Sequence, residues 1–284
     1  MTAVEMPRKF VVLTTQRSGS NYFCFWLNNH PNVRCHSELF LRKYNGMDGF
    51  GYYCNSTLLR RVLYGISDNR ILSGIPYNFV ISGLIKNFYD SLLNNPTHSG
   101  PITDGEDMKL RRHYHPRGNP EKDKAIGFKL MYDQLEYYGF LKSLIRAENI
   151  YIIHLIRNNP LKIYLSKLTR RKRGIAHSVR EVKEVKVWVN PKTLLHRLDR
   201  TIEAQRKMKI LFSNNPYLEI TSEDFFGNYS ETSKRTLGFL GVENRQIRMP
   251  RLKKLNPDSV GQIIENYDEI TKKLKGTPYE RFLD

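Results

Sequence analysis

Six consecutive residues near the start of the chain have the types that hold an anion: Gln16, Arg17, Ser18, Gly19, Ser20 and Asn21. They follow an aliphatic, β-branched run, and the stretch 19–29 has the composition of a helix. Backbone N–H groups at a helix start have no intrahelical partner, and with the helix dipole they bind anions. Arg17 adds a permanently charged donor. The stretch predicts an anion-binding loop, although it matches neither GxxxxGK[ST] nor GxGxxG.

A second group of candidate residues follows a later strand-like run. Arg157 ends the expected strand 149–157, and Ser166 lies in the helix expected to begin at Pro160, a residue suited to a first helical turn. An arginine leaving a strand and a serine on the next helix could hold a second phosphate. Open α/β sheets bind ligands at the carboxyl ends of their strands, which is where these groups are expected.

The elements that must position these groups alternate along the chain. Strands are expected at 9–15, 124–132, 149–157 and within 216–224. Helices are expected at 19–29, 133–148, 160–171, 191–214, 230–241 and 257–276, the last with Asn256 as its N-cap and Gly276 as its stop. The alternation predicts an α/β fold with a central parallel sheet and helices on both faces.

The stretch 42–123 interrupts this alternation and is rich in Gly, Asn, Tyr and Pro. We interpret it as a mostly helical or irregular insertion beside the active site, within a single domain that spans 1–284. In this interpretation the insertion shapes the acceptor pocket. The alternative is an irregular structural excursion without a functional role.

The formal net charge of +18 indicates an anionic partner or substrate. The basic residues lie in separate clusters, at 8–17, 109–117, 167–174 and 248–254. None has the sequence pattern of a nucleic-acid module, so a basic RNA-binding protein is the weaker interpretation. It would require the clusters to form one groove with stacking aromatic residues.

The composition and the cysteines of the chain indicate in which compartment the protein works and whether it spans a membrane or binds a metal. No stretch approaches the roughly 18 to 20 apolar residues of a membrane span, and the N-terminus has no apolar run of signal-peptide length. Cys24, Cys35 and Cys54 are an odd number without metal-ligand spacing. We therefore expect a cytoplasmic protein without a membrane span, without a metal site and without nucleic acid as a partner.

Together and in order, several segments resemble the sulfotransferases that use 3′-phosphoadenosine 5′-phosphosulfate (PAPS), in particular the bacterial lipopolysaccharide and trehalose type. "QRSGSN" is similar to their 5′-phosphosulfate loop and "RNNPLKIYLS" to their 3′-phosphate element. The resemblance continues in "HPNVRCHSELF", "GFKLMYDQL", "YLEITSEDFFGNYSETSKRTLGFLGV" and "LNPDSVGQIIENYDEITKKLKGTPYERFL". It implies a P-loop-like three-layer α/β/α fold, PAPS as co-substrate, 3′,5′-adenosine bisphosphate as product, and no metal requirement.

The sequence departs from these families at three points. Asn21 replaces the usual Ser or Thr, and the cytosolic branch has lysine where Arg17 stands. The spacing from Arg157 to Ser166 is one residue longer than in that branch, which leaves Ser178 as an alternative serine.

Four residues are candidates for the chemistry of sulfonate transfer, which needs a base at the acceptor and cations at the leaving oxygen. The resemblance implies that Glu38 takes the acceptor proton; His36 is the second candidate, and both would share a face if 36–40 is extended. Lys129 lies in an apolar strand where a lysine is costly to bury without an anion, so we assign it with Arg17 to the leaving group. A salt bridge or helix cap for Glu38, and a snorkelling edge lysine for Lys129, are the alternatives.

Lys253 and Lys254 are candidates for the 3′-phosphate, with a solvated basic loop as the alternative. The sequence predicts a sulfotransferase that moves a sulfonate group to a hydroxyl, amine or carbamate nitrogen. The acceptor is expected to be a glycoside or glycolipid sugar, or a specialised natural product such as a saxitoxin-type alkaloid. A small-molecule P-loop kinase is the main alternative; such a kinase would need a lysine after the glycine and an aspartate for Mg²⁺, and the loop has no lysine there.

Overall fold

The structure is a computed structural model of the 284-residue chain and describes residues 6–38, 122–137, 139–175, 178 and 182–283. Nearly all of the expected insertion, 42–121, lies outside these ranges. Its assignment to the acceptor pocket therefore stays a prediction.

The described strands form a five-stranded sheet in the order β2-β3-β1-β4-β5, with every neighbouring pair parallel. Their bounds are β1 (Arg8–Thr14), β2 (Val33–Glu38), β3 (Ala125–Met131), β4 (Tyr151–Ile156) and β5 (Tyr217–Thr221). The central strand, β1, is a continuous apolar run whose residues 10–13 are fully buried, as expected of a parallel strand covered on both faces. The α/β class with a parallel sheet is confirmed.

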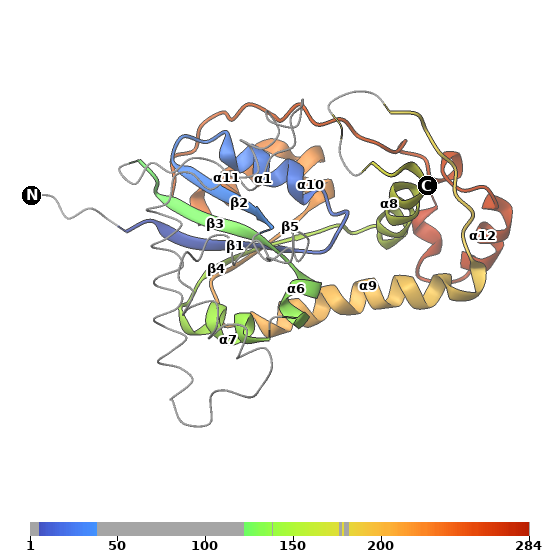
Figure 1. Ribbon diagram of the computed structural model, residues 1–284, viewed down its shortest axis with the longest axis horizontal. Coiled ribbons are helices and arrows are strands. Elements are labelled where there is room, and N and C mark those ends of the chain that lie inside the picture. The colour runs from blue at the N-terminus through green and yellow to red at the C-terminus, as the bar shows by residue number, and fades with distance from the viewer. Residues whose placement is uncertain (1–5, 39–121, 138, 176–177, 179–181, 284) are drawn as a thin grey trace, which may run out of the picture.

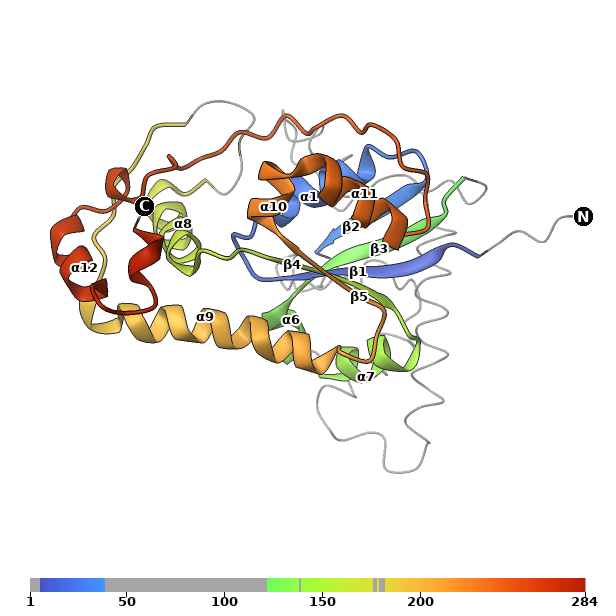
Figure 2. The ribbon, with the colours of Figure 1, turned by 180° about the vertical axis from the view of Figure 1, so that it is seen from behind.

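Helices cover both faces of the sheet (Figures 1 and 2). One layer holds α1 (Ser20–Asn28), α10 (Ser222–Gly227) and α11 (Tyr229–Phe239). The opposite layer holds α6 (Tyr132–Tyr137), α7 (Phe140–Ala147) and α9 (Pro191–Leu211). Beyond the carboxyl ends of the strands lie α8 (Pro160–Arg173) and α12 (Tyr267–Leu274), with the short 3₁₀ helices Val260–Gln262 and Glu280–Phe282 in the C-terminal segment.

Two hydrophobic cores hold these layers together. The first joins the sheet to α1, α10 and α11, and Phe10, Phe23, Trp26 and Phe225 are among its buried members. The second joins α8, α9 and the C-terminal segment, which include Leu161, Leu165, Leu198, Ile270 and Leu274. Since α8 belongs to the second core, the edge of the sheet at which β1 ends faces a separately packed helix.

A buried polar chain crosses the sheet face opposite α1. The two ring nitrogens of His154 in β4 are hydrogen-bonded, Nε2 to the hydroxyl of Tyr132 and Nδ1 to the hydroxyl of Tyr217. Burial, and to a lesser extent Lys209, lower the pKa of His154 to about 3. His154 is therefore a neutral histidine that joins β4 to the start of α6 and to β5.

Several element boundaries differ from the prediction. The helix expected at 133–148 is two helices, α6 and α7, and Gly139 lies in a turn between them. The helix expected at 257–276 is also wrong in its first half, because α12 begins only at Tyr267, and its N-cap is Asn266 and not Asn256. Strand β2 was not among the predicted strands. None of the helices that the structure describes is both long and apolar enough to cross a membrane.

Candidate functional site

Hydroxyl groups fasten the loop between β1 and α1 to the sheet. The hydroxyl of Thr14 donates to the carbonyl of Leu155 at 2.7 Å, and Thr14 Oγ1 lies 2.6 Å from Ser18 Oγ. At the first residue of α10, Ser222 Oγ donates to the carbonyl of Ser18 and also lies 3.0 Å from that of Ile156. The hydroxyl of Ser18 is therefore hydrogen-bonded within the protein, and the loop is tied to the ends of β1, β4 and β5.

Two residues of this loop adopt left-handed backbone conformations. Gly19 has φ 81° and is the N-cap of α1, where it has no side chain to cap the amides of the first turn, which starts at the buried Ser20. Arg17 has φ 71°, a conformation that costs an L-residue roughly 1 to 2 kcal/mol. A strained arginine next to an uncapped helix start is a reason to look for function here.

The two phosphate-binding elements predicted from the sequence meet in space. Arg17 Nε donates to Ser166 Oγ at 2.8 Å, and Arg157 Nη1 donates to the carbonyl of Arg17 at 3.4 Å. Asn159 caps α8 by accepting from the amide of Lys162 at 2.9 Å, which orients the helix that carries Ser166. Arg17, Arg157 and Ser166 thus form one cluster at the carboxyl ends of β1 and β4.

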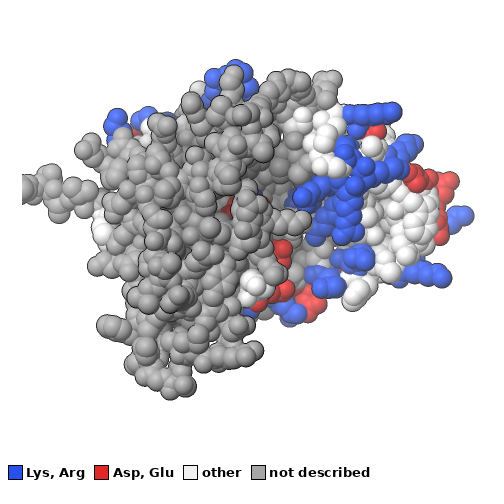
Figure 3. All heavy atoms as spheres, in the orientation of Figure 1, with Lys and Arg blue, Asp and Glu red and all other residues white. Residues whose placement is uncertain are grey.

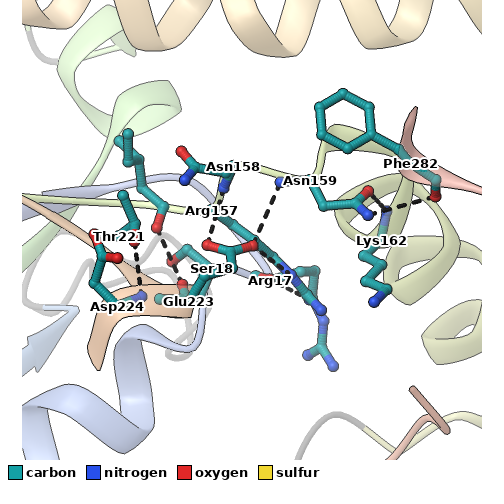
Figure 4. A network of polar contacts seen from close by, with 12 residues as sticks. Arg17, Ser18, Arg157, Asn158, Asn159, Lys162, Thr221, Glu223, Asp224 and Phe282 are labelled. Atoms are coloured by element: carbon teal, nitrogen blue, oxygen red, sulfur yellow. Dashed lines mark hydrogen bonds and ion pairs between the residues drawn. The ribbon is translucent and has the colours of Figure 1, made fainter. Parts of the chain in front are cut away.

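Glu223 in α10 supports this cluster from the other side (Figure 4). Its carboxylate accepts the backbone amides of Asn158 at 3.1 Å and Asn159 at 3.4 Å, and it lies 4.0 Å from Arg157 Nε. Thr221 caps the same helix by accepting from a backbone amide at 2.9 Å. The turn after β5 therefore holds the turn after β4, and the guanidinium of Arg157 is positioned between them.

Positive charge is concentrated around Arg17. Burial and then, in decreasing order, the neighbouring Arg170, Arg157 and Arg173 together lower the pKa of Arg17 to about 10. Burial also lowers the pKa of Arg157, which Glu223 opposes. These arginines remain charged at neutral pH, so their mutual repulsion is a cost that a bound anion would relieve.

The two candidate lysines of the C-terminal loop lie beside α8. Burial lowers the pKa of Lys254, and Lys162 and Arg157 lower it further, so its ammonium is within electrostatic reach of the arginine cluster. The backbone amide of Lys253 donates to the carbonyl of Ser178 at 2.9 Å. Ser178, the alternative to Ser166, is thereby placed at the C-terminal loop.

Lys129 in β3 is buried next to the start of α1. It is 1% exposed, its Nζ lies 3.0 Å from Glu38 Oε1, and it donates to Oδ1 of Asn21. Because Asn21 is the second residue of α1, the lysine ammonium lies beside the helix start that follows the loop. A buried lysine requires such partners. The residue that departs from the sulfotransferase pattern, Asn21, is a partner of the candidate leaving-group cation.

An irregularity in β2 brings Glu38 to Lys129. His36 is paired with Phe128 and Glu38 with Lys129, and the register shifts between them. Successive residues of β3 point to opposite faces, so His36 and Glu38 do too. The expectation that both share a face is wrong, because it assumed a regular strand. His36 is buried on the face away from Lys129.

Residues at the start of α6 complete the surroundings of Glu38. Gln134 Nε2 donates to Glu38 Oε2 at 3.3 Å, and its Oε1 accepts the amide of Met131 at 3.0 Å. Burial raises the pKa of Asp133, and the charge of Glu38 contributes in the same direction. Glu38 therefore has Lys129 on one oxygen and Gln134 on the other, while its side chain remains 23% exposed.

Sequence reasoning missed three contributors to the site. Ser222 and Glu223 follow β5 at the carboxyl edge of the sheet, and polar residues at that position were a readable signal. Phe226 is 54% exposed and lies close to Gly19. Its ring packs edge-on against that of Tyr22, with 5.1 Å between the ring centroids. No sequence signal marked this aromatic residue, because its position depends on the packing of α10 against α1.

The described residues contain no group of three or more His, Cys, Asp or Glu side chains arranged to hold a metal ion. The groups in the site that could hold an anion are arginines, lysines and backbone amides.

No protein-family model matches the chain, and no curated protein sequence matches it. Among solved structures it is similar to a sulfotransferase from Alicyclobacillus acidocaldarius, with a TM-score of 0.45 and 13% identity over 95% of this chain and 94% of the other. It is also similar to the sulfotransferase domain of the Synechococcus PCC 7002 olefin synthase, with a TM-score of 0.38 and 17% identity over 84% and 75%. A sulfotransferase domain from the curacin biosynthetic pathway gives 0.38 and 13% over 85% and 76%. At such low identity, a function has to be argued from the site.

Proposed function

We propose that the protein is a sulfotransferase that moves the sulfonate group of PAPS to a hydroxyl or nitrogen of a small-molecule acceptor. The observation that carries the proposal is the buried Lys129, paired with Glu38 beside the start of α1, where the anion-binding loop ends. A base and a cation lie within one ion-pair distance at the mouth of an anion site, and sulfonate transfer requires both.

The arginine cluster fits the donor nucleotide. PAPS has anionic groups at its 5′ and 3′ positions, and the chain offers two adjoining sets of cationic groups. The loop with Arg17 would hold the phosphosulfate end, while Arg157, Ser166 and the nearby Lys254 would hold the 3′-phosphate. The pKa of Arg17 is lowered first by burial and then by repulsion from neighbouring arginines, and this repulsion supports the assignment, since a bound polyanion would offset it.

Glu38 is the proposed base. In the proposed step its carboxylate takes the proton of the acceptor O–H or N–H as that atom bonds to sulfur, and the bond from sulfur to the 5′-phosphate oxygen breaks. Lys129 and Arg17 face the negative charge that develops on this leaving oxygen. Lys129 would shift from Glu38 toward that oxygen, which releases the carboxylate to act as a base. Glu38 is therefore free to act as a base only when the donor is bound.

The expected insertion between β2 and β3 would contribute the acceptor pocket in this proposal. Glu38 is the last residue of β2, so the chain enters that segment directly at the proposed base.

Ligand-induced thermal stabilisation tests the proposal. The protein should be strongly stabilised by 3′,5′-adenosine bisphosphate and not by ATP with Mg²⁺, because ligand binding to the folded state alone raises the melting temperature. The reverse result would favour a kinase and would overturn the donor assignment. Screening acceptors with labelled PAPS then identifies the reaction.

A further inference from the structure

A cavity of about 350 Å³ adjoins the arginine cluster, and Gln16, Lys167, Arg170, Arg171 and Gly174 line it. Three of these five residues are cationic. The proposed donor site uses none of the three directly.

The cavity borders two faces of α8, and only one of them is shared with the donor contacts. Side chains on a helix advance by about 100° per residue, so residues three and four apart share a face. Ser166, Arg170 and Arg173 form one row, in which Ser166 meets Arg17, Arg170 lines the cavity and Arg173 reaches Asn256 of the C-terminal loop at 3.3 Å. Lys167 and Arg171 form a second row, turned from the first toward α6 and α9. Figure 3 shows Lys and Arg side chains gathered over this part of the molecule.

The second row borders the proposed reaction centre. The negative charge of Asp133, at the start of α6, opposes the lowering of the Lys167 pKa, so the two side chains are close enough to interact. Asp133 in turn interacts with Glu38, the proposed base. On the other wall, Gln16 directly precedes Arg17 of the donor loop. The cavity therefore lies between the donor loop and the α6 side of the base, where an acceptor would extend.

The electrostatic surroundings of the cavity are positive. Burial lowers the pKa of Lys167, and Arg171, Arg197 and Arg200 contribute in the same direction, against the single opposing charge of Asp133. Arg170 and Arg171 are exposed at the cavity. A cationic ligand would be repelled here, whereas a carboxylate, phosphate or sulfate would meet two guanidiniums and an ammonium.

We propose that this cavity binds an anionic group on the acceptor, so that the acceptor is an acidic molecule, such as a phosphorylated, sulfated or carboxylated sugar. The inference rests on the proposed sulfotransferase function and narrows it. It favours an acidic glycoside or glycolipid over a guanidinium alkaloid of the saxitoxin type, whose charge has the wrong sign. Lys167 and Arg171 are the specificity-determining residues.

The first test measures anion binding apart from catalysis. Inorganic phosphate is titrated by calorimetry onto protein saturated with 3′,5′-adenosine bisphosphate, so that the donor site is already filled. We expect phosphate to bind, and Arg171→Ala to weaken it about tenfold, as expected for loss of one charge-assisted hydrogen bond. Lys172→Ala is the matched control, because Lys172 is the next residue of α8 but pairs with Glu265 at 2.7 Å.

The outcomes separate the inference from the function on which it rests. If the nucleotide binds but phosphate does not, or if both variants lose phosphate equally, the cavity is not an anion subsite and the inference fails. Phosphate that displaces the nucleotide would assign the cavity to the donor, which also overturns the inference. Failure of the nucleotide itself to bind would overturn the proposed function.

The second test uses turnover. Sugars are offered as acceptors in neutral, phosphorylated and carboxylated forms, with transfer followed by labelled PAPS. The acidic forms should have the lower KM, and Arg171→Ala should raise the KM of those forms about tenfold while leaving kcat and the neutral forms unchanged. Equal KM values for neutral and acidic forms would contradict the inference.

Discussion

The polar clusters around Lys129 and around Arg17 lie at the same edge of the sheet but are built on opposite principles. Lys129 is almost fully buried and has Glu38 and Asn21 as partners, so its charge is compensated within the protein. Burial lowers the pKa of Arg17, and the arginines that surround it contribute in the same direction. The first cluster is complete without a ligand, whereas the second gains most when an anion binds.

This difference assigns distinct tasks to the two clusters. A compensated pair in a buried place is held in position before the ligand binds, which suits groups that act on the reacting atoms. An array of like charges destabilises the protein when no ligand is bound. A bound anion relieves this repulsion, which strengthens ligand binding. Changes in the Lys129 cluster should therefore alter mainly turnover, and changes in the Arg17 cluster should alter mainly donor affinity.

The largest expected effect is on turnover. Glu38→Gln removes the proposed base but preserves the shape of the side chain and its contact with Gln134. We expect kcat to fall by roughly 10²- to 10⁴-fold, the usual range for loss of a general base. The dissociation constant of 3′,5′-adenosine bisphosphate, measured by calorimetry, should stay near that of the unmodified protein. A Glu38→Gln enzyme with full turnover on a good acceptor would show that another group takes the proton.

The second largest effect is expected on donor affinity, for substitutions in the Arg17 cluster. Arg17→Ala removes a charged donor from the loop, so we expect the dissociation constant of 3′,5′-adenosine bisphosphate to rise by about 10- to 100-fold. Ser166→Ala removes only the neutral hydroxyl that Arg17 contacts, and its effect should be several-fold smaller. If both variants lowered kcat without changing nucleotide affinity, the two clusters would not have separate tasks.

A smaller effect is expected where the clusters join, at Asn21. Asn21→Ala takes one hydrogen-bond acceptor from the buried ammonium of Lys129, which costs about 1 to 3 kcal/mol. We expect a lower melting temperature and a decrease in kcat of about tenfold, with nucleotide affinity little changed. Asn21→Ser, which introduces the residue type of the sulfotransferases that the sequence resembles, is the control and should recover part of both losses. Unchanged stability and kcat in Asn21→Ala would mean that Asn21 does not position Lys129.

The sequence predicted the elements of the fold better than their junctions. The alternation of apolar runs was sufficient for a parallel α/β sheet, because buried parallel strands are continuous and their helices are amphipathic. It could not predict the break between α6 and α7, nor the late start of α12, where the residues just before the helix pair with Val187 of a distant segment. Edge strand β2 reads as a mixture of polar and apolar residues, so periodicity did not mark it.

The same limit applies to the candidate site. Arg17, Arg157 and Ser166 could be grouped from sequence because each follows a strand at the same edge of the sheet. The opposite faces of His36 and Glu38 could not be predicted, since they depend on a one-residue shift in register. The partnership of Asn21 with Lys129 joins residues 108 positions apart, and only the packing of α1 on β3 creates it.

The hydrogen-bonded residues Tyr132, His154 and Tyr217 form a third polar cluster. Like the Lys129 cluster, it has its polar partners within the protein and needs no ligand. Its histidine has a pKa of about 3 in the folded protein against an ordinary 6.5. Between these values the unfolded chain binds the proton and the folded protein does not, so stability falls as the pH decreases from 6.5 toward 3. The slope from this one group is at most about 1.4 kcal/mol per pH unit.

His154→Gln retains hydrogen-bonding groups but does not titrate, so its stability should depend less steeply on pH across this window, by close to one proton. Urea unfolding at a series of pH values measures the slope directly. Nucleotide affinity at neutral pH should be unchanged, because this cluster lies on the sheet face away from α1. An unaltered acid slope would mean that His154 is protonated in the folded protein. A loss of nucleotide affinity would show that completed clusters can also serve binding, which would contradict the division of tasks between the clusters.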